Sequence, residues 1–169
     1  MAAEAAGVDI DRGRLAELYV RHAPDALRLA YLLTGDRALA EDLVQEAFAR
    51  LVGRLVHLRR SDAFPAYLRQ MVVNLSRMHF RRRRVERAFL DRHRERAPEP
   101  GSPDIDLQQD LWSAVQRLPE RQRAAIVLRY YEDLPEHQIA DLLRCRPGTV
   151  RSLLSRGMQT LRVGMREGI

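Results

Sequence analysis

The sequence predicts an all-α protein made of two small helical domains. Apolar residues make up 46% of the 169 residues, but aromatic residues only 6%, and the chain has just nine Gly and eight Pro. The apolar set is mainly Leu, Ala and Val, and Leu and Ala favour helices over strands. These residues recur at helical spacing in two regions that a proline-rich stretch separates. We therefore predict domains at 10–90 and 106–166, joined by a flexible linker at 91–105.

Three amphipathic helices account for the first domain. The first covers residues 15–33, and Gly35 then supplies a helix stop. Asp36 is placed to cap the next helix, which carries one broad apolar stripe from Leu39 to Leu55. A third helix begins near Phe64 and runs into the arginine-rich "FRRRRVER". A broad stripe on the middle helix is typical of a helix that packs in a core.

The predicted linker contains "RAPEPGSPD", with three prolines and one glycine in nine residues. Such a stretch cannot continue a helix, and it contributes little apolar surface. We therefore expect the two domains to move independently in the free protein.

The second domain reads as four short helices, at residues 107–118, 119–131, 135–143 and 147–162. Pro119, Pro135 and Pro147 stand where three of these helices begin. Only "RCR" joins the last two helices, and so short a connection predicts a helix-turn-helix.

Charge is unevenly distributed along the chain. All 29 basic residues are arginine, the net charge is +6, and the pI is near 10.3. Residues 77–96 hold nine arginines against three acids, and residues 144–166 hold six arginines and no acid. Between them, residues 98–120 hold five acids and one arginine. Two basic patches that flank an acidic spacer indicate a polyanionic partner, either nucleic acid or an anionic membrane surface.

The last predicted helix is the strongest candidate for DNA contact. In a helix-turn-helix the second helix lies in the major groove. Val150 and Leu154 can pack behind it, which leaves Arg151, Ser155 and Arg156 facing outward. The backbone amides of Gly148 and Thr149 would lie at its start, where a helix N-terminus can hold a phosphate. A solvated surface helix is the alternative, although such helices usually intersperse acids among their arginines. For the run 81–84, a phosphate-binding role and a solvated helix end are equally consistent with the sequence.

Other classes of function find no support in the sequence. A single cysteine, Cys145, excludes an internal disulfide, and the five histidines show no metal-ligand spacing. There is no glycine-rich phosphate cradle and no Ser/His/Asp arrangement, so we predict no catalytic residues, no metal, no cofactor and no enzyme activity. The N-terminus lacks the pattern of a signal peptide, and the longest apolar runs are about five residues, too short for a membrane span. We expect a cytoplasmic protein.

Taken together, the motifs resemble those of the extracytoplasmic-function sigma factors of bacterial RNA polymerase. "LYVRHAPDALRLAYLLTGDRALAEDLVQEAFARL" is similar to conserved region 2 of that family, and "FPAYLRQMVVNLSRMHFRRRR" to the helix that follows. "LPERQRAAIVLRYYEDLPEHQIADLLRCRPGTVRSLLSRGMQTLR" is similar to region 4. These segments cover about four-fifths of the chain in the order of the family. No single motif carries the resemblance, which makes it specific.

The resemblance implies a subunit that binds core RNA polymerase and directs it to the −10 and −35 elements of promoter DNA. The residues that it assigns to core polymerase are Asp42, Gln45, Glu46 and Phe48. For the −10 element it implies the turn and helix from His57 to Arg84, with Phe64, Tyr67, Asn74, Arg77, Arg81, Arg82, Arg83 and Arg84. For the −35 element it implies Gly148, Thr149, Arg151, Ser152, Ser155 and Arg156. It also makes an anti-sigma factor a plausible partner.

The chain departs from the family pattern at several positions. Arg144 stands where Gly is usual, and a left-handed backbone there would cost an arginine about 1 kcal/mol. Pro135 replaces a frequent capping Ser, and Leu153 a common basic residue. Tyr67 stands for a usual Trp, and both rings can stack on bases.

Two other functions are open on sequence grounds. A stand-alone helix-turn-helix regulator would bind operators as a dimer, but it has no need for the "AEDLVQEAF" helix. A helical adaptor that binds only proteins would have equal affinity for promoter and random DNA. Co-purification with core polymerase separates the first alternative from a sigma factor, and DNA affinity separates the second.

Overall fold

The computed structural model describes residues 2–55, 63–90 and 109–167, and within these ranges the protein is helical with no strand. The elements are α1 (Ala2–Thr34), α2 (Arg37–Leu55), α3 (Phe64–Leu90), α4 (Gln109–Arg117), α5 (Glu120–Ile126), a π-helical turn η2 (Val127–Tyr131), α6 (Glu136–Leu143) and α7 (Pro147–Glu167). The predicted all-α class is confirmed. The predicted linker lies outside the described residues, so the domain boundaries stay predictions. No helix of the described part is both long and apolar enough to cross a membrane.

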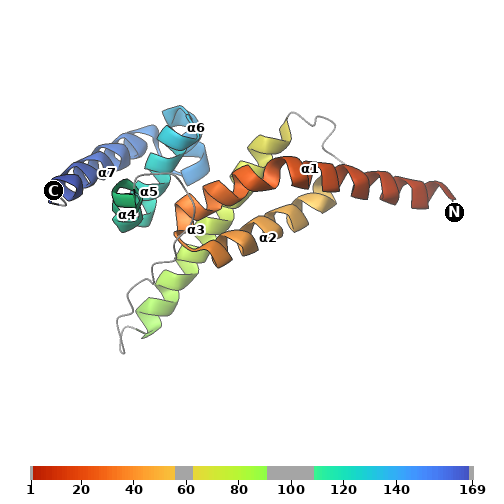
Figure 1. The fold of residues 1–169 in the computed structure, drawn as a ribbon, viewed down its shortest axis with the longest axis horizontal. Helices are drawn as coiled ribbons and strands as arrows, with labels where there is room; N and C mark the ends of the chain where they lie inside the picture. The colour runs from red at the N-terminus through yellow and green to blue at the C-terminus, as the bar shows by residue number, and fades with distance from the viewer. Residues whose placement is uncertain (1, 56–62, 91–108, 168–169) are drawn as a thin grey trace.

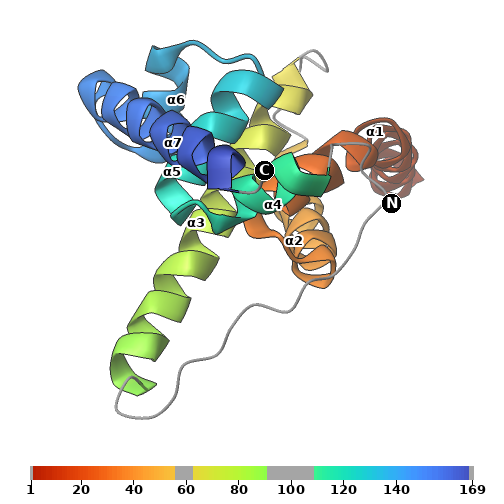
Figure 2. The ribbon, with the colours of Figure 1, turned by 60° about the vertical axis from the view of Figure 1, so that its left-hand side comes forward.

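Helices α1, α2 and α3 pack on one another and form the first half of the molecule (Figure 1). Their shared core contains Val44 and Leu51 from α2 and Phe64, Val72 and Val73 from α3, all of them almost fully buried. Burying a side chain of this size stabilises the fold by about 1.5–3 kcal/mol. The C-terminal part of α3 leaves this core and projects away from it, with every residue from 81 to 89 exposed (Figure 2).

A tight turn between α1 and α2 follows the sequence prediction. Gly35 has a φ of 72°, a left-handed conformation that glycine adopts without strain. The Asp36 carboxylate accepts a hydrogen bond from the Leu39 backbone N–H at 3.0 Å, so Asp36 caps α2 as expected.

The second half, α4 to α7, contains the predicted helix-turn-helix in α6 and α7. Its buried residues include Leu128 from η2, Ile139 and Leu143 from α6, and Val150 from α7. The predicted helix at 119–131 is divided into α5 and η2, because its last turn has π-helical hydrogen bonding. Single π-helical turns of this kind occur inside α-helices.

The turn between α6 and α7 has the left-handed residue that the family resemblance suggested. Arg144 ends α6 with φ 49° and ψ 55°, where a side chain is strained and glycine is not. Pro135 begins the same helix without a side-chain cap, as expected from the missing Ser. Cys145 is half-buried in the turn and packs against the core.

The two halves are packed against each other through a continuous core. Tyr31 of α1 stacks on Trp112 of α4, with ring centroids 4.5 Å apart and planes 11° from parallel. The Gln116 side-chain amide donates to the Leu32 carbonyl at 3.2 Å, and its oxygen accepts from Arg123 at 2.9 Å. These contacts hold one arrangement of the halves, in contrast to the independent motion expected from the linker. We call it the closed arrangement.

Gly35 is part of this contact because Gln116 lies directly over it. A Cβ built on Gly35 would come within 2.3 Å of the Gln116 Oε1 atom. Arg123, only 8% exposed, in turn places its guanidinium 5.5 Å from the centre of the Phe80 ring of α3. Gln116 therefore links α1 to Arg123, and Arg123 links the second half to α3.

We expect Gln116→Ala to weaken the closed arrangement. The change removes both side-chain hydrogen bonds and leaves the buried Arg123 with one partner fewer, which costs about 1–3 kcal/mol. Chemical denaturation should show this loss, and small-angle scattering should show a larger radius of gyration than for the parent. Gln70→Ala, at an exposed position of α3, is the matched control. Equal stability and size for the two variants would contradict the linking role of Gln116.

Candidate functional site

The outward face of α2 carries three of the four residues predicted to contact polymerase. Asp42, Gln45 and Glu46 are exposed, and Glu46 forms an ion pair with Arg50 one turn further along. An ion pair of this exposed kind contributes little to stability, so these side chains are available to a partner.

Phe48, the fourth predicted contact, is a core residue. It is only 4% exposed, and its ring lies 4.8 Å from that of Tyr19 and 5.8 Å from that of Phe64. Direct polymerase contact by Phe48 stays a prediction, and in this arrangement its ring faces the core. Its aromatic cluster fixes α2 against α1 and α3.

The predicted −10 residues on α3 divide into buried and accessible groups. Phe64 is 1% exposed in this arrangement, with its ring against those of Phe48 and His22, so its predicted contact with the −10 element stays a prediction. Tyr67, at 47% exposed, can present its ring to a partner, and Asn74 is half-buried. The run 81–84 is exposed along the projecting part of α3. The turn 57–62 that precedes this helix lies outside the described residues.

Two of the α3 arginines face the second half of the molecule. Arg77 donates to the Leu142 carbonyl at 3.3 Å, and Arg84 pairs with Glu120 at 2.7 Å. Burial lowers the pKa of Arg77, and the nearby positive charges of Arg144 and Arg121 lower it further. The closed arrangement thus occupies part of the surface predicted for the −10 element.

Helix α7 presents most of its predicted −35 residues to solvent. Gly148, Arg151, Ser152, Ser155 and Arg156 are exposed, whereas Thr149 is half-buried. Val150 and Leu161 are buried behind them, and a Cβ on Gly157 would approach Ile126 of α5 to 3.0 Å. The predicted division of α7 into a packed back and an exposed front is correct.

The start of α7 is only partly available to a phosphate. The Thr149 N–H donates to the Arg146 carbonyl at 2.9 Å, and the predicted phosphate contact by this amide stays a prediction. Gly148 has open space where a side chain would stand, which lets a partner approach its backbone closely.

The two outward arginines of α7 differ in their surroundings. Arg151 pairs with Glu136 of α6 at 2.6 Å, whereas Arg156 has no ion pair with any residue that the structure describes. A guanidinium group that has no ion pair with a carboxylate within the protein keeps its N–H donors free to bind guanine or phosphate. Glu136 was not among the predicted site residues, although it is recognisable in the sequence as an acid in the first turn of the first helix of the helix-turn-helix.

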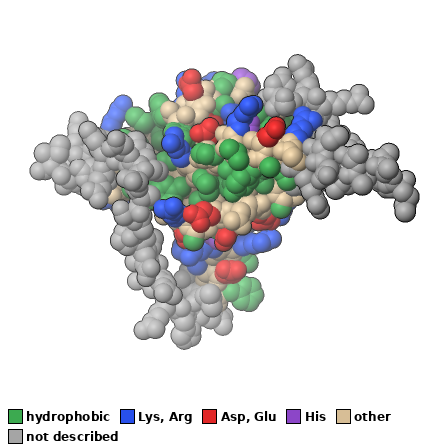
Figure 3. Space-filling model, turned by 45° about the vertical axis from the view of Figure 1, so that its right-hand side comes forward, with side chains coloured by type: hydrophobic (Ala, Val, Ile, Leu, Met, Phe, Trp, Pro, Cys, Tyr) green, Lys and Arg blue, Asp and Glu red, His purple; other side chains and the backbone are tan. Residues whose placement is uncertain are grey.

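Apolar side chains also reach the surface in several places. Those that are large and exposed within the described residues include Tyr19, Val20, Met78, Tyr130 and Tyr131. Figure 3 shows one face on which hydrophobic side chains gather at the centre, with arginine and acidic side chains around and below them. A mixed surface of this kind suits a protein partner.

Across the described ranges, no group of three or more His, Cys, Asp or Glu is placed to hold a metal ion.

Comparison with known proteins identifies both halves. Residues 18–86 match the family model "Sigma-70 region 2", and residues 108–161 match "Sigma-70, region 4". The chain is 39% identical over 153 residues to the ECF RNA polymerase sigma factor SigE of Mycolicibacterium smegmatis, covering 86% of this chain and 59% of that protein. It is 34% identical over 151 residues to RNA polymerase sigma-E factor of Streptomyces coelicolor, covering 86% of this chain and 83% of that one.

A solved structure has the same fold. It is the sigma factor RpoE from Bartonella quintana, crystallised with the anti-sigma factor NepR, with a TM-score of 0.71, 23% identity, and coverage of 89% of this chain and 96% of that chain. The sequence matches lie on the two halves that carry the exposed α2 face, the α3 arginines and the helix-turn-helix. The chain therefore belongs to the extracytoplasmic-function sigma factors.

Proposed function

We propose that three exposed helix faces, one each on α2, α3 and α7, make the separate contacts of a sigma factor with polymerase and promoter DNA. As a sigma factor, the protein binds core RNA polymerase and directs it to promoter DNA. The face of α2 with Asp42, Gln45 and Glu46 docks on the polymerase. Helix α3 binds the −10 element, and α7 reads the −35 element. The observation that carries this assignment is the outward face of α7, which is basic and exposed while its back is buried on α5 and α6.

The shape of α7 suits the DNA groove at the −35 element. The outward strip of α7 contains Arg151, Ser155 and Arg156, which lie within about one and a half turns of one another. An α-helix fits the major groove of B-DNA, and arginine can donate two hydrogen bonds to guanine. Because α6 holds the back of α7, the strip can enter the groove without disturbing the core.

Helix α3 offers the −10 element positive charge and one exposed aromatic ring. Arginines along the projecting part of α3 suit the phosphate backbone, and Tyr67 offers a stacking surface for an unpaired base. In the closed arrangement Arg77 and Arg84 contact the second half instead. Full engagement of the −10 element therefore requires that the two halves separate.

Place of action and further partners follow from this role. A factor that works with core polymerase acts in the cytoplasm, contributes binding rather than catalysis, and needs no cofactor. An anti-sigma factor that holds it inactive remains a predicted partner.

The test is run-off transcription with purified core polymerase on a library of genomic promoter fragments. We expect the protein to make transcription start at a subset of fragments that share two spaced sequence elements. A stand-alone regulator would bind DNA without co-purifying with core polymerase, and a protein-only adaptor would bind promoter and random DNA equally. Either result would contradict the proposal.

A further inference from the structure

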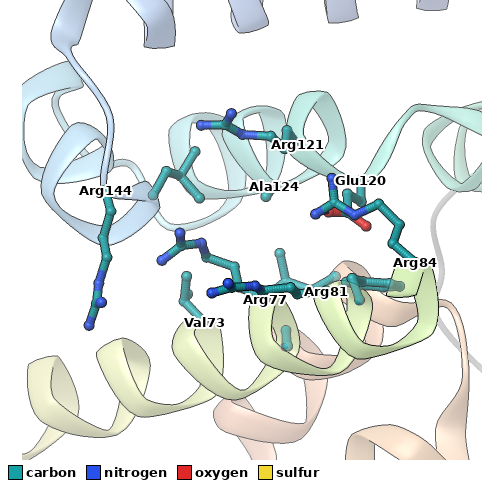
Figure 4. Close-up of a pocket in the computed structure, with 12 residues that line it drawn as sticks. Val73, Arg77, Arg81, Arg84, Glu120, Arg121, Ala124 and Arg144 are labelled. Atoms are coloured by element: carbon teal, nitrogen blue, oxygen red, sulfur yellow. The ribbon is translucent and has the colours of Figure 1, made fainter. Parts of the chain in front are cut away.

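A cleft rich in arginine lies where the two halves meet. One wall is α3, with Arg77, Arg81 and Arg84, and the other is formed by α5 and the end of α6, with Glu120, Arg121 and Arg144. Figure 4 shows the three α3 side chains extending toward the gap below α5, with Arg121 and Glu120 on the opposite side and Arg144 at one end. We call this space the arginine cleft.

Among the described residues, most of the arginines that line the arginine cleft have no acidic partner. Glu120 is the one acid among the described lining residues, and Arg84 already pairs with it at 2.7 Å. Arg77 donates to a neutral carbonyl, and Arg81, Arg121 and Arg144 have no ion pair with any described residue. Burial lowers the pKa of Arg77, and the like charges of Arg144 and Arg121 lower it further, as expected for guanidinium groups placed close together.

Repulsion between these like charges opposes the closed arrangement that creates the cleft. Arg144 also stands in a left-handed backbone conformation with φ 49°, but this strain is local to the turn between α6 and α7. A bound anion would turn this repulsion into attraction, since several guanidinium groups could each donate to it.

Size and chemistry together define the ligand. The cleft has a volume of about 250 Å³, which corresponds to roughly eight waters at about 30 Å³ each. This is below the range of roughly 300–1,000 Å³ for pockets that enclose a whole drug-sized molecule. It suits a compact chain of phosphates, for which planar guanidinium forks are the preferred partners.

We infer that the arginine cleft is a binding site for a small polyphosphate anion that stabilises the closed arrangement. The phosphates are free inorganic polyphosphate or the phosphate tail of a nucleotide whose base remains outside. The site exists only while the two halves are in contact. It shares Arg77, Arg81 and Arg84 with the predicted −10 surface of α3, whereas Arg121 and Arg144 belong to the cleft alone.

The test uses the full chain and sodium triphosphate, without divalent cations, at constant ionic strength adjusted with sodium chloride. We expect saturable binding at one site by calorimetry and a rise in melting temperature with triphosphate concentration. Parallel titrations with GTP and ATP distinguish free polyphosphate from the phosphate tail of a nucleotide as the ligand. Tighter binding of a nucleotide than of triphosphate would assign the site to a nucleotide tail, and equal binding would assign it to the phosphates alone.

Variants of the second half make the test specific. Arg121→Gln and Arg144→Gly should each weaken triphosphate binding at least tenfold. Arg144→Gly also relieves the left-handed strain, so the melting temperature of this variant without ligand should be unchanged or higher than that of the parent. Weaker triphosphate binding by this variant would then not result from unfolding. Arg162→Gln removes one charge from an exposed position of α7 that does not line the cleft, and should bind like the parent.

The inference fails if triphosphate has no more effect than chloride at equal ionic strength. It also fails if Arg162→Gln weakens binding as much as Arg121→Gln does, because general charge attraction would then explain the result. Neither Arg121 nor Arg144 belongs to the proposed polymerase or promoter contacts. A failure here therefore leaves the transcription assay as an independent test of the proposed function.

Discussion

Asp42→Arg is expected to abolish binding to core RNA polymerase while the protein stays folded. Asp42 is exposed on α2 and has no ion pair among the described residues, so replacing it changes stability by no more than about 0.5 kcal/mol. In an interface, however, a like-charge contact costs several kcal/mol, and every 1.4 kcal/mol weakens binding tenfold. Binding of fluorescently labelled protein to purified core polymerase measures the effect.

A matched control for this prediction is Asp141→Arg on α6. It makes the same change in net charge at an exposed residue of the second half, away from the α2 face. Circular dichroism should show the same helicity for both variants and the parent. If Asp42→Arg binds core polymerase as tightly as Asp141→Arg, the α2 face does not include Asp42 as a contact.

Local features of this fold were predictable because local interactions determine them. The cap by Asp36 and the left-handed turn at Gly35 depend on residues within one helical turn. The short connection between α6 and α7 likewise allowed the helix-turn-helix to be predicted from sequence. Each of these needs no knowledge of the rest of the molecule.

Side chains on broad apolar stripes were harder to assign. Phe48 and Phe64 were predicted to contact partners, yet both are buried in one aromatic cluster. Helical periodicity indicates which face is apolar, but it does not separate residues at the centre of a stripe from those at its edge. Tyr67, at such an edge, remains accessible.

Contact between the two halves could not be read from the sequence at all. It depends on pairs that are distant along the chain, such as Gln116 with the Leu32 carbonyl and Arg77 with the Leu142 carbonyl. No periodic pattern encodes such a pair. The proline-rich composition around residues 96–104 pointed instead to independent domains, because composition describes the connection and not the surfaces that it connects.

Arg156→Ala is expected to reduce the ability of the protein to distinguish promoters with and without the −35 element. Arg156 is exposed on the outward strip of α7 and has no described ion pair, whereas Arg151 must first leave Glu136, 2.6 Å away. Loss of a base-reading arginine costs about 1–3 kcal/mol at one promoter position, equivalent to roughly 5–150-fold in affinity. Transcription from paired promoters at equal protein concentration measures the loss, with helicity checked by circular dichroism.

Arg162→Ala provides the comparison that separates reading from electrostatic attraction. Arg162 lies further along α7 and is also exposed, so its removal deletes the same charge from the same helix. A phosphate contact affects all sequences alike and contributes about 0.9 to the slope of log affinity against log salt. We therefore expect Arg162→Ala to weaken binding to both promoters equally and to preserve their ratio, whereas Arg156→Ala should lower the ratio. If a folded Arg156→Ala protein discriminates between the promoters as well as Arg162→Ala does, Arg156 does not read the −35 element, and Arg151, once released from Glu136, becomes the residue to test in its place.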